Sequence, residues 1–335
     1  MHVDTALTRR QAAAALGGAL LAPSFASIGF AQTRTKTVRL GDVVATDNPE
    51  YAAHEFFAKR VGELTKGEYE VKIFPNSVLG GHTVMNEQVR SGTLELAKSG
   101  QGFLTSYDKR LGVINLPFLY ANSSKLFRAL DGKLGKAYGD VIEQYGFKVL
   151  GFYDSGIRNV YNKKGPVRTP DDVKKLNLRL RSQPDKVMIA TLNLIGAQAV
   201  PLQAGEIYNA ISQGVVDGAE NNINYYLTTK HNEVAQYYSK TRHFFGTDPF
   251  LASLKWYGEL TPSVQKALLQ AGREATAFER KTSAAEERRS YERCPALGVK
   301  LNECDVEAFR RVALPVWNDF AADLGSLFDI LKQTQ

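Results

Sequence analysis

The sequence predicts an α/β fold of two lobes, joined by several crossings of the chain and braced by one long helix, and three observations support this prediction. The chain has 335 residues, 44% hydrophobic and 23% charged, a composition typical of globular proteins and a length of about two domains. Strand and helix patterns alternate from residue 37 onward, an order typical of mainly parallel sheets. Residues 262–293 contain no helix breaker except Gly272, which predicts a helix of roughly 45 Å, and no linker rich in Pro, Gly or Ser divides the chain.

The N-terminal residues 1–31 are predicted to be a signal peptide. Two arginines (residues 9–10) precede an uncharged stretch, residues 12–22, which is too short for a bilayer span of about 20 residues. Small residues predict cleavage after Ala31, with Ala26 as the alternative. The paired arginines resemble a twin-arginine signal, and an ordinary secretory signal is the alternative. Either signal leads to a periplasmic location.

Strands and helices alternate in the first third of the chain. Asn48 is a helix cap followed by Pro49 at the first helical position, a combination typical of helix starts. Alternating apolar residues mark the strands, and apolar residues at helical spacing mark the helices. The predicted elements are strand 37–41, a helix from 49 to about 64, strand 69–73, helix 82–91 and strand 94–98.

The same order continues through the rest of the chain. Thr169 caps a helix that begins with Pro170 and two acidic residues, which favour the positive end of the helix dipole. The last helix contains Pro315, where it should kink or break. The predicted elements are a helix from 122 or 123, helix 133–145, strand 147–153 ending at 154–156, a helix from 170, strand 177–181, a helix from about 185 to 196, helix 205–213, a strand from 215 leading into 217–222, helix 262–293 and a helix from about 305.

Composition and motifs argue against nucleic-acid binding, cofactor binding and catalysis. The formal net charge is +7, but lysines and arginines are scattered among acidic residues, as in a surface that attracts small anions weakly. The sequence contains no Gly-x-Ser-x-Gly, no phosphate-binding glycine loop, no His-Glu-x-x-His and no Cys-x-x-Cys. We therefore expect no enzyme activity, no cofactor and no metal site.

The two cysteines, Cys294 and Cys304, are predicted to form a disulfide. An exported protein meets an oxidising compartment, and the spacing allows a short turn to close between them. Two buried thiols are the alternative. A metal site is not expected, because no histidine stands at ligand spacing near them.

Arginines near strand ends are the first candidates for anion binding. Arg158 follows a strand end and the turn at Gly156. Arg179 and Arg181 share one face of strand 177–181, opposite three leucines. The planar guanidinium of Arg179 suits a carboxylate bidentately, and the alternative is an edge-strand arginine that forms a salt bridge at the surface.

Other polar residues lie where ligands are expected in α/β proteins. Lys98 ends strand 94–98 and shares a face with Leu94 and Leu96. Its side chain either extends from the core so that the ammonium group reaches water, or enters a cleft. Asn221 and Asn222 end a strand, where their amides suit hydroxyl-bearing ligands or merely form a turn. His82 begins a helix and is a candidate ligand residue or a surface residue. Most tyrosines after residue 222 are expected to pack in the core, with Tyr225 as a candidate wall of a pocket.

The chain resembles the solute-binding proteins of TRAP (tripartite ATP-independent periplasmic) transporters over essentially the whole mature sequence. The resemblance depends on an ordered set of motifs rather than on a single piece. These are Arg39-Leu40-Gly41, Phe74 to Gly80, Gln88 to Glu95, Leu116-Pro117-Phe118-Leu119, Asp154 to Arg158, Thr169 to Asp172, Leu178-Arg179-Leu180, Gly205 to Ala210 and Gly214 to Asn221.

The resemblance implies two α/β lobes that close around an organic acid. The carboxylate-binding arginine of the family falls on Arg179, a companion arginine on Arg158 and a pocket asparagine on Asn221. His82 and Lys98 fall on positions that face the ligand in relatives. The sequence departs from many relatives at Asn48, where they have histidine, and at Arg181, where they have proline, and Arg181 is left without a role. The full predicted set of ligand residues is Arg179, Arg158, Asn221, Lys98, His82, Asn222, Ser182 and Tyr225.

The resemblance also implies a function, partners and lobe boundaries. We expect a monomer that delivers an organic acid to the small and large membrane subunits of a TRAP permease. Asp154-Ser155-Gly156, Lys98 and Asn221-Asn222 resemble the branch that binds sugar acids such as hexuronates, while C4-dicarboxylates or other keto or aromatic acids are alternative ligands. A sensor that presents its ligand to a receptor is a second possible function. The predicted lobes are 32–155 plus 247–286, and 156–246 plus 287–335.

Overall fold

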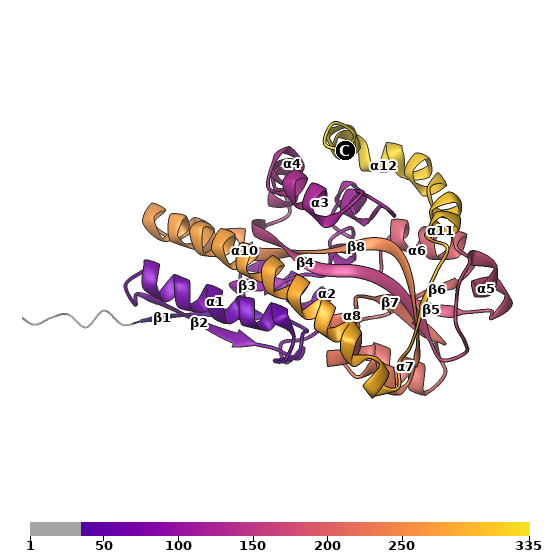
Figure 1. Cartoon of the computed structure of the whole chain (residues 1–335). Coiled ribbons are helices and arrows are strands. Elements are labelled where there is room, and N and C mark those ends of the chain that lie inside the picture. The colour runs from indigo at the N-terminus through magenta and orange to yellow at the C-terminus, as the bar shows by residue number, and fades with distance from the viewer. Residues whose placement is uncertain (1–34) are drawn as a thin grey trace, which may run out of the picture. The chain divides into compact units, whose positions relative to one another are not determined.

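The computed structural model describes residues 35–335, which fold around one mixed nine-stranded sheet (Figure 1). The sheet has the strand order β2-β1-β3-β8-β4-β7-β5-β6, and β9 pairs with β8. The predicted signal peptide, with both cleavage sites and the paired arginines, lies outside the described residues. Within residues 35–335, each helix is either too short or too polar to cross a membrane.

The elements follow the predicted alternation of strands and helices. The strands are β1 (Lys36–Gly41), β2 (Tyr69–Phe74), β3 (Leu96–Lys98), β4 (Phe147–Asn162), β5 (Arg179–Ser182), β6 (Gln198–Pro201), β7 (Gly218–Asn221), β8 (Tyr237–Ser253) and β9 (Lys300–Glu303). The α-helices are α1 (Pro49–Leu64), α2 (His82–Ser91), α3 (Ser123–Leu130), α4 (Lys133–Glu143), α5 (Pro170–Lys175), α6 (Lys186–Leu194), α7 (Ile207–Ser212), α8 (Ile223–Thr228), α9 (Leu254–Gly258), α10 (Pro262–Arg293), α11 (Val306–Ala313) and α12 (Pro315–Lys332). Short 3₁₀ turns are η1 (Gln101–Phe103), η2 (Lys109–Asn115), η3 (Ala204–Glu206), η4 (His231–Glu233) and η5 (Pro295–Leu297).

Two long antiparallel strands connect the two parallel parts of the sheet. β1 pairs in parallel with β2 and β3, and β5 pairs in parallel with β6 and β7, while β4 and β8 run antiparallel between these groups. The expectation of mainly parallel pairing therefore holds only within each group. The sequence also suggested that β4 ends at residues 154–156, but there the strand continues through a bulge, at which Gly156 has a φ of +75°.

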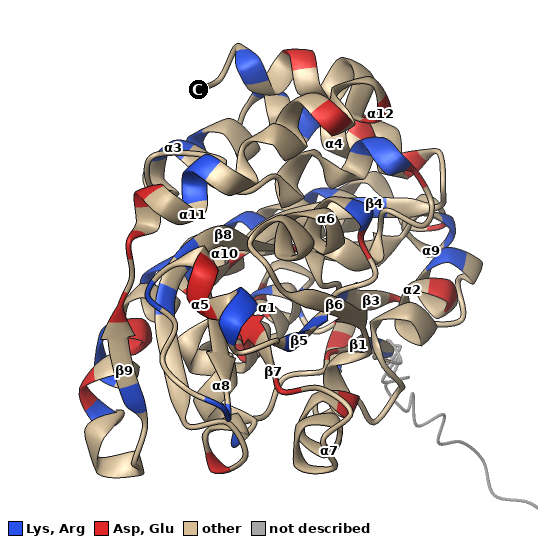
Figure 2. Ribbon diagram, turned by 90° about the vertical axis from the view of Figure 1, so that its right-hand side faces the viewer, with Lys and Arg blue, Asp and Glu red and all other residues tan. Residues whose placement is uncertain are grey.

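Separate hydrophobic clusters stabilise the two ends of the sheet. Val38, Leu40 and Phe57 pack with α10 at the β1 end, and Leu178 and Leu180 pack with α6 and α11 at the β5 end. Basic and acidic residues are interspersed along the ribbon (Figure 2), so the positive net charge is not gathered on one element of residues 35–335.

The long helix α10 has the predicted bounds and packs directly on β4. Its Gly272 lies so close that a Cβ there would be 2.7 Å from the carbonyl oxygen of Leu150, and a Cβ on Gly151 would clash with Oγ1 of Thr276. The helix contacts α1 and α8, which belong to different ends of the sheet. The glycine in the middle of the helix therefore permits a close helix–strand contact.

The C-terminal helix breaks at Pro315, as predicted, into α11 and α12. Trp317 in α12 donates from Nε1 to the carbonyl of Pro117 at 2.9 Å, and α12 packs on η2 and α4. Residues after Pro315 thus contact segments that were assigned to the first lobe. The lobe boundaries themselves stay a prediction.

The predicted disulfide is absent, and both cysteines are free thiols in the structure. The Sγ of Cys294, at the end of α10, donates to the carbonyl of Ser290 at 3.2 Å. The Sγ of Cys304, after β9, donates to the carbonyl of Val167 at 3.1 Å. The two thiols pack in different hydrophobic clusters, so the short turn that would join them does not form.

A pair of carboxyl groups lies between α10 and the bulge of β4. Glu279 is fully buried, its Oε2 accepts a 2.7 Å hydrogen bond from the backbone N of Asp154, and its Oε1 accepts one from Ser283. Burial and the neighbouring Asp154 raise the pKa of Glu279 well above its usual value, and burial raises the pKa of Asp154 to about 6. Neither carboxylate has a lysine, arginine or histidine nitrogen within 4.0 Å among the described residues.

We expect the Glu279→Gln substitution to stabilise the protein at high pH. Because folding raises the pKa of this carboxyl group, its ionisation destabilises the native state as the pH rises above the unfolded pKa of about 4.3, by up to about 1.4 kcal/mol per pH unit. The variant should therefore unfold at a higher temperature than the wild type at pH 8, and the difference should shrink at pH 4.5. Differential scanning calorimetry measures it. Glu292→Gln, at an exposed position of the same helix, is the control and should show no such pH trend. A variant that is less stable than wild type at pH 8 would contradict this prediction.

We expect two reactive thiols per chain when the unfolded protein is titrated without a reducing agent. Burial raises the pKa of Cys294 to about 11 and that of Cys304 to about 12, so both thiols should react slowly in the folded protein. Titration with a thiol reagent in denaturant measures the count. A count of zero, rising to two after reduction, would show that the cysteines pair.

Candidate ligand-binding site

A small cavity lies at the carboxyl ends of β3, β5 and β7, where ligands bind in open α/β sheets. Its volume is about 30 Å³, which holds a water molecule or two. Its walls come from segments far apart in sequence. The lining residues are Val43, Glu50, His82, Lys98, Gly100, Phe103, Ser155, Arg158, Arg181, Gln183, Ala204, Asn221, Tyr225 and Asp248.

Arg181 is a buried cation that has no counterion among residues 35–335. Its residue is 2% exposed, and its Nε donates to the carbonyl of Leu202 at 2.9 Å. Among the described residues no carboxylate oxygen lies within 4.0 Å, and the two terminal nitrogens have no hydrogen-bond acceptor. Burial lowers the pKa of Arg181 from its usual value, although the more distant charge of Glu220 opposes this shift. A guanidinium nevertheless keeps its proton in proteins, so this side of the cavity carries an uncompensated positive charge.

Arg158 lines the cavity as predicted, but its charge is already balanced. Its Nε and Nη2 donate to the two carboxylate oxygens of Glu220 at 2.6 and 2.7 Å, and its Nη1 donates to Oδ1 of Asn221 at 2.9 Å. The bidentate ion pair fixes the guanidinium plane. Arg158 thus holds Asn221 at the cavity wall.

The prediction that Arg179 lines the cleft is wrong. Its Nη2 and Nε donate to the carboxylate of Asp217 at 2.8 and 3.1 Å, and its side chain is 40% exposed. This is the surface salt bridge that the sequence left open as the alternative. Arg179 and Arg181 do share a face of β5, but two residues along a strand are about 6.6 Å apart. Only Arg181, toward the carboxyl end, reaches the cavity.

Lys98 lines the cavity but is surrounded by acidic groups. Its Nζ lies 2.7 Å from Glu50, 2.9 Å from Asp248 and 3.4 Å from Asp42. Burial alone would lower the pKa of Lys98, but the three carboxylates outweigh this effect and raise it well above its usual value. Burial raises the pKa of Glu50 to about 7, although Lys98 opposes the shift. This wall therefore presents carboxylate oxygens rather than a free cation.

His82 lies at the start of α2 and faces the cavity in its neutral form. Burial lowers the pKa of His82 to about 4. Its Nδ1 accepts a 3.3 Å hydrogen bond from the backbone N of Gly100, and the proton is therefore placed on Nε2. His82 supplies a hydrogen-bond donor to the wall formed by Glu50 and Asp248.

The remaining predicted residues divide into two groups. Asn221 and Tyr225 line the cavity, and their contact with a ligand stays a prediction. Asn222 instead caps α8, where its Oδ1 accepts from the backbone N of Tyr225 at 2.7 Å. Ser182 is fully buried at the end of β5, next to Arg181 but outside the lining.

The predicted set of ligand residues omitted five polar residues of the lining, namely Glu50, Ser155, Arg181, Gln183 and Asp248. Glu50 had a sufficient explanation as an acid in the first turn of α1. Asp248 lies inside the long strand β8, and no local pattern distinguishes it. Gln183 accepts from the backbone N of Gly102 at 2.7 Å, a contact between the two ends of the sheet. The face pattern of strand 177–181 was the only available signal for Arg181.

Comparisons with known proteins identify the family of the chain. A family model described as "Bacterial extracellular solute-binding protein, family 7" matches residues 40–323. The chain is 31% identical to a solute-binding protein of Chromohalobacter salexigens, over 96% of this chain and 95% of that protein. It is 28% identical to the 2,3-diketo-L-gulonate-binding periplasmic protein YiaO of Escherichia coli, over 94% of this chain and 96% of that protein.

Solved structures with the same fold contain sugar acids. A TRAP periplasmic solute-binding protein of Sulfitobacter sp. NAS-14.1 with bound β-D-galacturonate is 32% identical and superimposes with a TM-score of 0.85, covering 89% of this chain and all of that one. A TRAP solute-binding protein of Chromohalobacter salexigens with bound D-glucuronate is 31% identical, with the same TM-score and coverage. The chain therefore has the two-lobed fold of these proteins and belongs to family 7 of the bacterial extracellular solute-binding proteins, the periplasmic organic-acid-binding components that work with TRAP membrane permeases.

Proposed function

We propose that this protein binds a sugar acid of the hexuronate class and delivers it to a TRAP permease. The observation that carries the proposal is the buried guanidinium of Arg181, which has no counterion in the described part of the chain and lines a small cavity together with Glu50 and Asp248. The galacturonate and glucuronate bound in the similar structures support the same class of ligand.

The carboxylate of the ligand is assigned to Arg181. Burying a charge without a partner is costly, and a carboxylate satisfies the two free terminal nitrogens with parallel hydrogen bonds. Arg158 does not compete for this role, because Glu220 and Asn221 occupy its donors. One carboxylate on the ligand balances the positive charge of Arg181.

The hydroxyl groups of the ligand are assigned to the opposite wall. Glu50 and Asp248 present acceptors for hydroxyl protons, and His82 presents a donor at Nε2. A C4-dicarboxylate would place its second carboxylate against Glu50 and Asp248, where like charges repel. This distribution of charge favours a polyhydroxylated monocarboxylate.

Ligand entry requires the walls to separate, because a cavity of about 30 Å³ is smaller than a hexuronate. We place the hinge at the β4 bulge between Asp154 and Gly156, which faces Gly246 and Thr247 on β8 and matches the predicted lobe boundaries. The contact of Gln183 with Gly102 then forms on closure. A ligand that touches both walls stabilises the closed form, which the permease recognises.

The proposal also covers the oligomeric state, the fate of the ligand, the membrane partners and the export route. The protein acts as a monomer, leaves its ligand chemically unchanged and delivers it to a small and a large membrane subunit. The paired arginines at 9–10 direct export by the twin-arginine route.

We expect Arg181→Met to abolish binding and Arg179→Ala to preserve it. Losing one partner of a buried charge pair costs about 2–5 kcal/mol, so the affinity for D-glucuronate or D-galacturonate should fall at least about 30-fold in Arg181→Met. Calorimetric titration measures both variants. The ligand-free Arg181→Met protein should unfold no more easily than wild type, because an unpaired buried charge has been removed. Loss of binding in Arg179→Ala alone would reverse the assignment.

We expect the opposite wall to set the preference for sugar acids over dicarboxylates. Hydrogen bonds to charged groups contribute about 1.5–3 kcal/mol, so Glu50→Gln should weaken hexuronate binding roughly tenfold or more. Glu55→Gln, exposed on the same helix, is the matched control and should bind normally. A thermal-shift series with hexuronates, succinate and malate compares the classes. Tighter binding of succinate than of every hexuronate would refute the proposed ligand class.

A further inference from the structure

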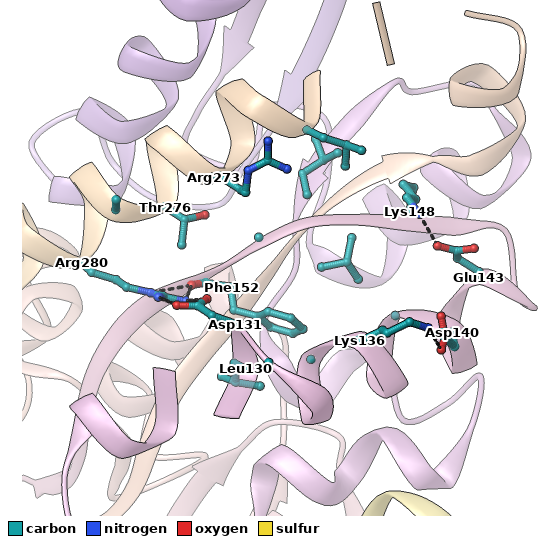
Figure 3. Close-up of a pocket in the computed structure, with 18 residues that line it drawn as sticks. Leu130, Asp131, Lys136, Asp140, Glu143, Lys148, Phe152, Arg273, Thr276 and Arg280 are labelled. Carbon is teal, nitrogen blue, oxygen red and sulfur yellow. Dashed lines mark hydrogen bonds and ion pairs between the residues drawn. The ribbon is translucent and has the colours of Figure 1, made fainter. Parts of the chain in front are cut away.

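A second hollow, far larger than the ligand cavity, lies between α4 and α10. It is a groove of about 840 Å³, and Figure 3 shows Arg273, Thr276 and Arg280 of α10 along one side and Lys136 of α4 along the other, with Phe152 between them. Volumes of about 300–1,000 Å³ are typical of sites for small organic molecules.

Apolar side chains form the floor of the groove, and a glycine in one wall leaves room for a ligand to lie against the helix. Val149, Leu150 and Phe152 of β4 form the floor together with Leu269 of α10. Along residues 147–154, β4 pairs only with β8, so its other edge faces the groove. The wall from α4 carries Gly139, where a Cβ would have no atom within 4 Å.

The charges around the groove are paired, with one exception. Asp131 pairs with Arg280 at 2.7 Å, Asp140 with Lys136 at 2.6 Å, and Glu143 with Lys148. Dashed lines in Figure 3 mark these contacts. Arg273 lines the groove, and within residues 35–335 no carboxylate oxygen lies within 4.0 Å of its guanidinium.

We propose that this groove is a second binding site, for an amphipathic carboxylate. The carboxylate pairs with Arg273, and the apolar body lies on Val149, Leu150 and Leu269. The unpaired cation selects an anion, and the apolar floor selects a ligand with a hydrocarbon body rather than a sugar acid. This inference does not rest on the proposed function.

Octanoate is the probe, and octylamine, which has the opposite charge, is the mismatched control. Isothermal titration should detect octanoate binding to the wild-type protein, at least tenfold weaker binding of octanoate to Arg273→Ala, and at least tenfold weaker binding of octylamine to the wild type. Gly139→Phe should abolish octanoate binding, because its ring fills the groove without a clash at Cβ. Gly258→Phe, at an exposed position with equal space on α9, should bind octanoate like the wild type.

The Arg181→Met variant separates this site from the ligand cavity. Octanoate should bind to it as tightly as to wild type. Loss of octanoate binding in Arg181→Met would place the probe in the ligand cavity and overturn the proposal. Absence of binding to the wild type, unchanged binding in both Arg273→Ala and Gly139→Phe, or equal binding of octylamine would overturn it as well. Binding of an extended peptide to the β4 edge with no binding of octanoate would assign the groove to a different occupant.

Discussion

The uncompensated positive charge of Arg181 is the interaction on which the account of this protein depends. Burying a guanidinium without a counterion destabilises the folded protein. The described residues around Arg181 supply no such counterion. Glu220 neutralises Arg158, and three carboxylates surround Lys98, so these two cations do not remain available to a ligand. Arg181 is the exception, and we propose that a carboxylate from solution pairs with it. Pairing with a ligand carboxylate relieves this destabilisation and thereby contributes to the free energy of binding.

The sheet places this charge where two independently packed regions meet. One wall comes from the carboxyl end of β3 and the first turns of α1 and α2, and the other from the ends of β5 and β7. The strands β4 and β8 pass between the regions, and α10 packs along β4 through Gly272. Polar groups with opposite roles thus face one another across the cavity, the cation on one side and acceptors on the other. In the proposed function, this division favours a ligand with one charged end and a hydroxylated body.

Sequence patterns predicted the fold class well and the site only partly. The bounds of α10 and the break at Pro315 follow from local rules on helix breakers, which need no tertiary information. Alternation in strand 177–181 correctly placed Arg179 and Arg181 on one face, but it cannot say which end of the strand reaches a cavity. Asp217, which comes from a segment distant in sequence, binds Arg179 and so holds it away from the cavity. The turn suggested at Gly156 is a bulge for a similar reason, because pairing with β8 continues past it.

The charge on the ligand gives the most direct test of the account. Isothermal titration compares D-glucuronate with D-glucuronamide, its neutral amide, which has nearly the same shape and the same hydroxyl groups. If Arg181 binds a carboxylate, the amide should bind at least about 30-fold more weakly, since an ion pair of this kind contributes about 2–5 kcal/mol. Equal affinities for the acid and the amide would contradict the central role of the buried guanidinium.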